Sequence, residues 1–317
     1  MTSFPVARDS KVYVAGHRGM VGAAILRKLK KDGFTKIVTR TSSELDLRNR
    51  KRVFEFFESE KPEIVFLAAA KVGGILANDT YPADFLSDNL QIQLNVMDAA
   101  NAYECDRLVF LGSSCIYPKF APQPIPEEAL MTGHLESTND AYAIAKIAGI
   151  KQVQAIRRQY GRKWISIMPS NLYGPGDNYD PELSHVLPAL IRRYEEAKHS
   201  GNKEVTNWGS GDPKRELLFV DDLADACIFL LENYDSDQHI NIGTGVDHSI
   251  REISESVATA VGFTGETLWD ITKPDGTPRK LLDIAKARNL GWSPKTDLES
   301  GIISALQDFR EKVSGQA

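Results

Sequence analysis

The chain has 317 residues, 42% of them hydrophobic and 26% charged, which is typical of a globular protein with room for one large domain or two joined ones. The formal net charge is −5 and the Lys and Arg residues are scattered, so the composition gives no indication of a nucleic-acid partner. The three cysteines lack metal-ligand spacing, so we expect neither a metal site nor a disulfide framework. The first residues do not resemble a signal peptide, and no apolar run approaches the roughly 20 residues that span a bilayer. We therefore expect a cytoplasmic protein without a membrane segment.

The first half of the chain alternates short β-rich runs with amphipathic helical patterns. We expect strands at residues 11–16, 36–40, 63–70, 107–114 and 165–175. Apolar side chains recur with helical spacing between these runs, and we expect helices at residues 20–33, 49–61, 82–104 and 141–161. Strands that alternate with helices in this way predict an α/β fold with a Rossmann-type doubly wound parallel sheet.

The pattern changes from about Leu172, where turn-rich segments interrupt it. A helical run is followed by one more expected sheet strand at residues 239–245, and the remainder indicates helices with short strands between them. We therefore expect an NADP-binding Rossmann domain of residues 1–171 and about 219–247. A smaller C-terminal substrate-binding lobe would hold residues 172–218 and 248–317. Clefts between two such lobes are common ligand sites.

A glycine-rich turn follows the first expected strand and opens the first helix. Gly16, Gly19 and Gly22 have a GxxGxxG spacing, which suits a tight turn and close approach of the backbone to a pyrophosphate. Sites for NAD usually carry an acidic residue after the second strand, whereas this chain has Arg40 there. A cation suits the 2′-phosphate of NADP(H), and Arg18 could add a second; the alternative is that Arg40 is a solvated surface residue. The cations Arg40 and Arg18 therefore favour NADP(H) over NAD as the cofactor.

Three polar residues indicate carbonyl chemistry. Tyr142 and Lys146 are four residues apart, so they share one helix face. A lysine beside a phenol stabilises the phenolate, which a tyrosine needs for acid–base work near neutral pH. Ser113 is expected at the carboxyl end of a strand, where doubly wound sheets bind ligands, and its hydroxyl could hold the same carbonyl oxygen.

Cys115 stands two residues beyond Ser113. Side chains alternate in an extended segment, so we expect Ser113 and Cys115 to face one side while Ser114 points away. A lone cysteine is most often a small buried residue, and this alternative to a catalytic thiol stays open.

The chain resembles the extended short-chain dehydrogenases/reductases and, within them, the GDP-L-fucose synthase family. The motifs that carry this resemblance include "AGHRGMVG", "FLGSSCIYPKFAPQPIPE", "YAIAKIAGIK", "MPSNLYGP" and "WGSGDPKRE", and they extend over almost the whole chain. One departure is Phe219, where similar proteins often have a histidine.

The resemblance implies an enzyme that converts GDP-4-keto-6-deoxy-D-mannose to GDP-L-fucose, a bifunctional isomerase and NADP-dependent oxidoreductase. It would epimerise C3 and C5 through an enolate and then reduce C4 with NADPH. Cys115 would be the base and His185 the acid of the epimerisations, although His185 alone would be interpreted as a surface residue at a helix start. The implied catalytic residues are Ser113, Cys115, Tyr142, Lys146 and His185.

The same resemblance implies the binding residues. We also expect a homodimer, because the long helices at 82–100 and 141–159 could form a dimer bundle. The cofactor would contact Gly16, His17, Arg18, Gly19, Met20, Val21, Gly22, Arg40, Leu111, Gly112, Ser113, Ser114, Lys146, Pro169, Ser170, Asn171, Leu172 and His185. The GDP part of the substrate would contact Arg193, Trp208, Arg215, Asp275 and Lys280. We expect the Pro-rich stretch at 118–128 to be an ordered loop over the cleft.

Two enzymatic alternatives and one non-enzymatic alternative remain. A nucleotide-sugar 4-epimerase or 4,6-dehydratase would keep NAD bound, and Arg40 and the Cys115/His185 pair count against it. A related enzyme acting on a GDP-6-deoxy-4-keto-heptose is compatible with the same motifs. A non-enzymatic NADP-binding regulator would not need the complete set of Ser113, Tyr142 and Lys146.

Overall fold

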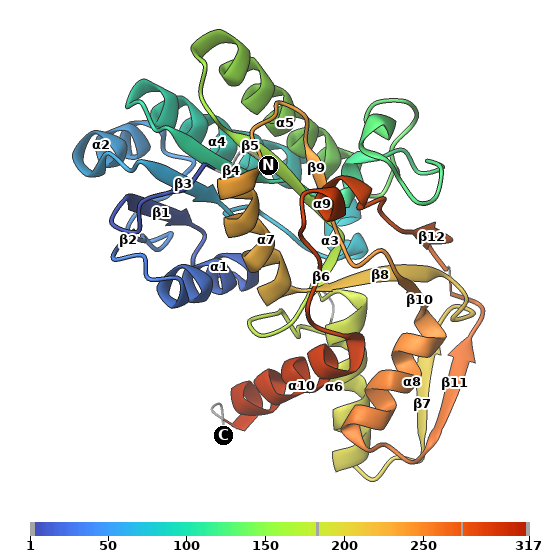
Figure 1. Cartoon of the computed structure of the whole chain (residues 1–317). Coiled ribbons are helices and arrows are strands. Elements are labelled where there is room, and N and C mark those ends of the chain that lie inside the picture. Colours follow the sequence, from blue (N-terminus) through green and yellow to red (C-terminus); the bar gives the residue numbers. More distant parts are fainter. Residues whose placement is uncertain (1–3, 182–183, 274, 315–317) are drawn as a thin grey trace.

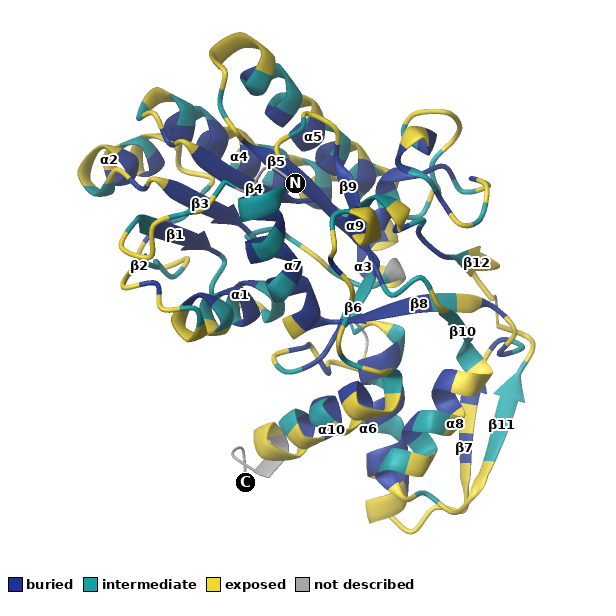
Figure 2. Cartoon of the chain, viewed as in Figure 1, coloured by how far each residue is buried: buried dark blue, intermediate teal, exposed yellow. Residues whose placement is uncertain are grey.

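The computed structural model describes residues 4–181, 184–273 and 275–314. Six parallel strands form a central sheet in the order β2-β1-β3-β4-β5-β9 (Figure 1). They are β1 (Lys11–Ala15), β2 (Lys36–Val38), β3 (Ile64–Leu67), β4 (Arg107–Leu111), β5 (Ile165–Pro169) and β9 (Ile240–Ile242). Both faces of this sheet are covered, which explains why its inner strands are apolar along nearly their whole length (Figure 2).

Helices pack on both faces of the central sheet, as a doubly wound fold requires. One face carries α1 (Met20–Lys31) and α7 (Val220–Asn233), and a core cluster joins them to the strands. The other face carries α2 (Arg50–Glu60), α4 (Pro82–Ala102) and α5 (Asp140–Tyr160). The predicted Rossmann-type architecture is therefore confirmed.

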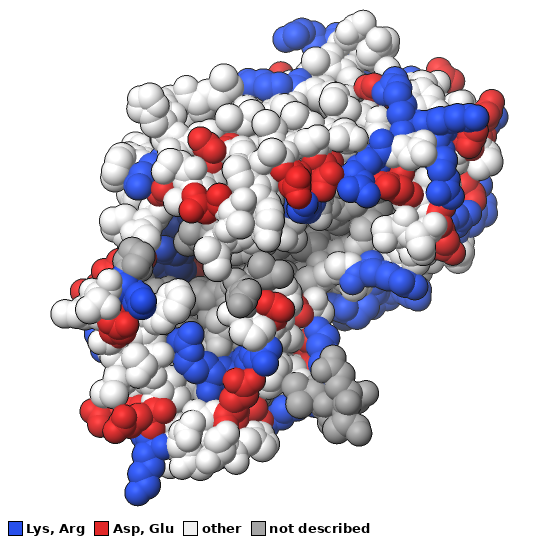
Figure 3. Space-filling view, turned by 180° about the vertical axis from the view of Figure 1, so that it is seen from behind, with Lys and Arg blue, Asp and Glu red and all other residues white. Residues whose placement is uncertain are grey.

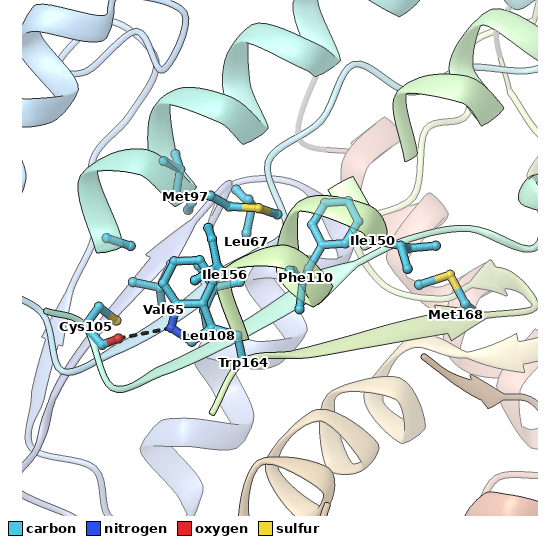
Figure 4. Packing of buried hydrophobic residues seen from close by; sticks show 14 of the residues in the cluster. Val65, Leu67, Met97, Cys105, Leu108, Phe110, Ile150, Ile156, Trp164 and Met168 are labelled. Atoms are coloured by element: carbon cyan, nitrogen blue, oxygen red, sulfur yellow. Dashed lines mark hydrogen bonds between the residues drawn. The ribbon is translucent and has the colours of Figure 1, made fainter. Parts of the chain in front are cut away.

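Large side chains fill the second of these cores (Figure 4). Trp164 is fully buried just before β5, and its indole N–H donates to the carbonyl of Cys105 at 3.0 Å. The ring of Phe110 from β4 lies under α5, with Ile150 and Met168 nearby in the same cluster (Figure 4). The single polar atom of the tryptophan is thus satisfied, so the ring adds apolar contact without an unpaired buried donor.

A second, smaller body is built around β8 (Lys214–Phe219). This strand pairs in parallel with β6 (Asn171–Tyr173) and β12 (Arg279–Lys280) and antiparallel with β10 (Asp247–Ser249). Its other strands are β7 (Glu204–Trp208) and β11 (Glu266–Asp270), which pair in parallel. Its helices are α6 (Val186–His199), α8 (Ile250–Val261) and α10 (Leu298–Ser314). Short helices α3 (Ile75–Thr80) and α9 (Ala285–Asn289) complete the described elements, together with 3₁₀ turns at Ser114–Ile116 and Glu127–Ala129.

The structure divides one stretch that the sequence pattern suggested as continuous. The run at 165–175 breaks at Ser170, so that β5 ends in the central sheet and β6 begins the second sheet. Ser170 N–H donates to the carbonyl of Ile242 on β9, so Ser170 still pairs with the central sheet before the chain enters β6. The chain crosses between the two bodies here.

The C-terminal third returns to the central sheet. Leu282 and Ile284 belong to one core cluster of that sheet, and Ala287 and Trp292 belong to the other. The domain boundaries expected from the sequence stay a proposal. The packing described here adds residues 281–292 to the body that contains the central sheet. Residues 1–3 and 315–317, at the outer ends of the expected domain ranges, lie outside the described residues. In the described part of the chain no helix is long and apolar enough to cross a membrane.

Gly149 marks the closest contact of α5 with the sheet and generates a stability prediction. A Cβ at Gly149 would lie 2.3 Å from Cζ of the Phe110 ring. Ala is favoured over Gly in an open helix by about 1 kcal/mol, but overpacking a core costs about 1–3 kcal/mol. We expect Gly149→Ala to lower the midpoint of urea unfolding. The control is Arg158→Ala, on the exposed face of the same helix, which should change the free energy of unfolding by less than about 0.5 kcal/mol. A Gly149→Ala protein more stable than the wild type would contradict this packing.

Candidate active site

The glycine turn between β1 and α1 has the geometry of an anion cradle. Gly16 has a φ of +85°, and a Cβ there would lie 2.7 Å from the backbone nitrogen of Ala69. A Cβ at Gly22 would lie 2.1 Å from the carbonyl oxygen of Gly16. The first turn of α1 has no side-chain cap and no acidic residue, so its backbone N–H groups are free of side-chain partners. These features fit the pyrophosphate of a dinucleotide.

Of the expected 2′-phosphate residues, Arg40 lies just beyond β2 and Arg18 lies in the glycine turn before α1. Arg40 donates to Glu60 at 2.7 Å and to its neighbour's carbonyl, and its guanidinium stacks over Phe56. Glu44 accepts hydrogen bonds from Thr41, which lower its pKa together with the charges of Arg40 and Arg18. Arg18 and Arg40 therefore lie near the same carboxylate, beside the glycine turn.

Two further cofactor segments lie at the carboxyl ends of β4 and β5. Gly112 N–H donates to Ile167 O at 2.9 Å, and a Cβ on Gly112 would lie 2.3 Å from the sulfur of Met168. In the described part of the chain, the buried hydroxyl of Ser170 and the buried Nδ1 of His17 have no hydrogen-bond partner. Of the remaining predicted cofactor residues, Gly19, Met20 and Val21 lie at the start of α1, and the others lie at or just beyond the ends of β4 and β5, namely Leu111, Ser114, Pro169, Asn171 and Leu172.

Tyr142 and Lys146 lie on one face of α5, as expected. Lys146 is buried, its ammonium donates to the carbonyl of Leu111 at 2.8 Å, and its Nζ lies 5.7 Å from the centroid of the Tyr142 ring. Burial lowers the pKa of Lys146 to about 8. Burial also raises the pKa of Tyr142, and the nearby thiol of Cys115 adds to this, whereas a hydrogen bond with Ser113 opposes it. Ser113, Cys115, Tyr142 and Lys146 are thus in one cluster.

The expectation of an extended segment at Ser113–Cys115 is wrong. Ser113 is extended, but residues Ser114–Ile116 form a 3₁₀ turn that begins at Ser113. The hydroxyl of Ser113 accepts the N–H of Cys115 at 3.3 Å and so caps this turn. Ser114 is buried while Ser113 and Cys115 are partly exposed, so the two predicted side chains do reach the site, through a turn rather than through strand alternation.

The Cys115 thiol has two N–H neighbours from distant segments. Nδ2 of Asn139 and Nζ of Lys280 each lie 3.5 Å from Sγ. Asn139 occupies the N-cap position of α5, yet its side chain makes no cap hydrogen bond, and its buried Oδ1 has no partner among the described residues. The sequence analysis missed Asn139, because an Asn before a helix is ordinarily interpreted as a cap.

His185 occupies the N-cap position of α6, and its side chain makes no cap hydrogen bond. Burial lowers its pKa, and the charge of Lys280 lowers it further. The imidazole is therefore within electrostatic reach of the ammonium that contacts Cys115. Lys280 therefore lies near both expected proton-transfer residues.

The expected nucleotide-binding residues lie on the second body. Arg193 donates to Asn207 at 2.6 Å, Arg215 donates to the carbonyl of Thr277, and burial lowers the pKa of both guanidiniums. Neither Arg forms an ion pair with a carboxylate in the described residues, so both remain available to an anion. Trp208 is 67% exposed.

Asp275 is already occupied within the protein, because its carboxylate accepts the backbone N–H and the hydroxyl of Ser210.

Seen from behind, the surface is hollowed between the upper and lower parts of the molecule, and Lys and Arg side chains lie on the lower part beside the hollow (Figure 3). Within the described residues no group of three or more His, Cys, Asp and Glu could hold a metal ion. The site can therefore combine proton transfer at one end with anion binding at the other.

Comparison with known proteins agrees with this geometry. Residues 12–243 match the NAD dependent epimerase/dehydratase family. GDP-L-fucose synthase 1 of Arabidopsis thaliana is 60% identical over 96% of this chain and 95% of its own length. GDP-L-fucose synthase of Escherichia coli K12 is 51% identical over 95% of this chain and 97% of its own length.

A solved structure is similar along the whole chain as well. The GDP-mannoheptose C4 reductase of Campylobacter jejuni with NADP bound has a TM-score of 0.88 and 37% identity, covering 96% of this chain and 100% of that one. The glycine turn, the Ser113–Tyr142–Lys146 cluster and the near full-length matches lead to one assignment. The chain belongs to the NAD dependent epimerase/dehydratase family, in the branch that contains the GDP-L-fucose synthases.

Proposed function

We propose that this protein converts GDP-4-keto-6-deoxy-D-mannose and NADPH to GDP-L-fucose and NADP⁺. The observation that carries the proposal is the convergence of Ser113, Cys115, Tyr142 and Lys146 in one cluster, with Lys280 in contact with Cys115 and near enough to His185 for its charge to lower the pKa of that imidazole. Relatives 51% and 60% identical are named GDP-L-fucose synthases, which supports the choice of substrate.

The epimerisation follows from the acidity of the substrate. In a 4-keto sugar both C3 and C5 are next to the ketone, so removal of either proton gives an enolate whose charge lies on the same oxygen. The hydroxyls of Tyr142 and Ser113 lie in the same cluster and can both donate to that oxygen. Cys115 takes the proton from one face, and His185 returns a proton from the other, which inverts the carbon.

The reduction uses the same oxygen site. When bound, NADPH supplies the hydride to C4. Tyr142 donates its proton to the oxygen as the C–O double bond becomes single, and the raised pKa of this phenol keeps it protonated until then. Lys146, anchored to Leu111 O, holds a positive charge near the ring and limits the cost of the phenolate.

The cofactor residues support NADP(H) over NAD. Arg40, just beyond β2, and Arg18, in the glycine turn, both lie near Glu44, and a C. jejuni relative carries NADP.

The same relative is named a GDP-mannoheptose C4 reductase, so a GDP-6-deoxy-4-keto-heptose is the second candidate substrate. Product analysis with both sugars separates the two. An NAD-retaining 4-epimerase or 4,6-dehydratase would consume no coenzyme in that assay.

We also propose a cytoplasmic homodimer that forms through α4 and α5. These helices pack side by side, and Leu94 and Ile144 on them are 43% and 49% exposed, which leaves apolar side chains on the outer face. Sedimentation at several protein concentrations tests this assembly.

Cys115→Ser tests the base. We expect product formation to fall by about 10²-fold or more, because a hydroxyl is a far weaker base than a thiolate. NADPH binding should be retained. The measurement is deuterium incorporation at C3 and C5 in D₂O, with NADPH absorbance followed in parallel. Cys227→Ala, which removes a thiol buried on α7, should keep the wild-type rate; GDP-L-fucose formed at the normal rate by Cys115→Ser would refute the assignment.

Arg40→Ala tests the coenzyme preference. We expect the Kd of NADPH to rise about tenfold, equivalent to about 1.4 kcal/mol, while that of NADH changes little. The matched control is Glu60→Gln, which releases Arg40 from its ion pair and should not weaken NADPH binding. Titration of coenzyme fluorescence measures the Kd of both coenzymes for the wild type and the two variants. An equal loss for both coenzymes in Arg40→Ala would mean that Arg40 does not contact the 2′-phosphate.

A further inference from the structure

We propose that Lys280 stabilises the thiolate of Cys115, and so serves as a positioning residue for the base rather than as a ligand of the diphosphate. Lys280 Nζ and Asn139 Nδ2 each lie 3.5 Å from Sγ. An ammonium has three donors and no acceptor, so its contact with sulfur requires sulfur to accept. A thiolate accepts far better than a thiol, and two donors from opposite segments therefore favour the charged form.

The other groups around Cys115 leave Lys280 as its cationic neighbour. Tyr142 on α5 has its pKa raised by burial and is a neutral phenol. Burial and the charge of Lys280 lower the pKa of His185 on α6, so a positive charge is less favoured there than on a free imidazole. Ser113 on the same turn and Asn139 are uncharged. Within the described residues Lys280 makes no ion pair with a carboxylate, so its charge is not offset by one.

The backbone on both sides of Lys280 is fixed before any substrate binds. Lys280 pairs with Arg215 in the β12–β8 register, and Leu282 N–H donates to Glu216 at 2.9 Å. On its other side, Leu281 N–H donates to the side chain of Gln123, and Ile125 N–H donates to Leu281 O. The loop that follows the Cys115 turn thus holds the strand that carries Lys280. The ammonium is brought to the sulfur by the fold itself.

The neighbouring Arg279 shows that this placement is selective. Its guanidinium pairs with Asp247 and is therefore already neutralised. Of the two adjacent cations on β12, Arg279 therefore pairs with a carboxylate, whereas Lys280 contacts the thiol. The assignment of Lys280 rests on the proposed role of Cys115 as the base, but its effect on the thiol can be measured without turnover.

The test is the pH dependence of alkylation of Cys115 by iodoacetamide in the protein without substrate, located by mass spectrometry. Cys105 and Cys227 are buried and should not react. We expect Lys280→Met to move the midpoint of the reaction upward by about one pH unit or more. Lys280→Arg, which keeps the charge, should stay near the wild-type profile. Lys214→Met, which removes an exposed cation from the neighbouring strand, should leave the profile unchanged.

Turnover and GDP binding complete the test. In Lys280→Met we expect kcat for epimerisation to fall about tenfold or more while the Kd of GDP changes little. An unchanged alkylation profile combined with weakened GDP binding would overturn the proposal and make Lys280 a diphosphate ligand. Thermal unfolding and NADPH binding check the fold, and Lys280→Gln replaces Lys280→Met if the latter is unstable. Failure of the wild-type protein to turn over the keto sugar would reject the proposed function but would leave the alkylation result valid.

Discussion

The placement of the cleft depends on one buried carboxylate, that of Glu216 on β8. It is completely inaccessible to solvent, and it accepts the backbone N–H groups of Gly245 and Leu282 at 2.7 and 2.9 Å. Burial raises its pKa, and these N–H groups oppose that shift. A Cβ on Gly243 would lie 2.2 Å from Oε1, so the loop after β9 has no room for a side chain at this position. One carboxylate therefore joins β8, the exit of the central sheet and the segment after β12.

This junction brings the two ends of the site together. Cys115, Tyr142 and Lys146 come from the central sheet and α5, whereas Lys280 and Arg215 come from neighbouring positions on the second sheet. In the proposed function the first set supplies proton transfer, and the second supplies positive charge. Because buried polar groups are costly unless they are paired, the network around Glu216 has few alternative arrangements, and the distance between the two sets is set by the fold.

The sequence predicted the parts of the fold that depend on local periodicity. The strands of the central sheet and the long helices α1, α4, α5 and α7 follow from apolar spacing, and the order of glycine turn, Ser113 and Tyr142–Lys146 identified the region of the site. The 3₁₀ turn at Ser114–Ile116 could not be predicted, since it depends on the Ser113 hydroxyl accepting the Cys115 N–H. Asn139 and the approach of Lys280 to Cys115 were also missed, because tertiary packing rather than local pattern creates them.

The distance of Lys280 from Cys115 along the chain, 165 residues, has a consequence for biosynthesis. A ribosome-bound chain that has completed the central strands already contains Cys115, Tyr142 and Lys146 but not Lys280. Its exposed sulfur therefore lacks the cation that favours the nucleophilic form, at the stage when the chain is most open to oxidants and to other proteins. With the role proposed for Lys280, the nucleophilic form is favoured only once β12 has joined the second sheet, so the order of synthesis would protect the thiol until the site is complete.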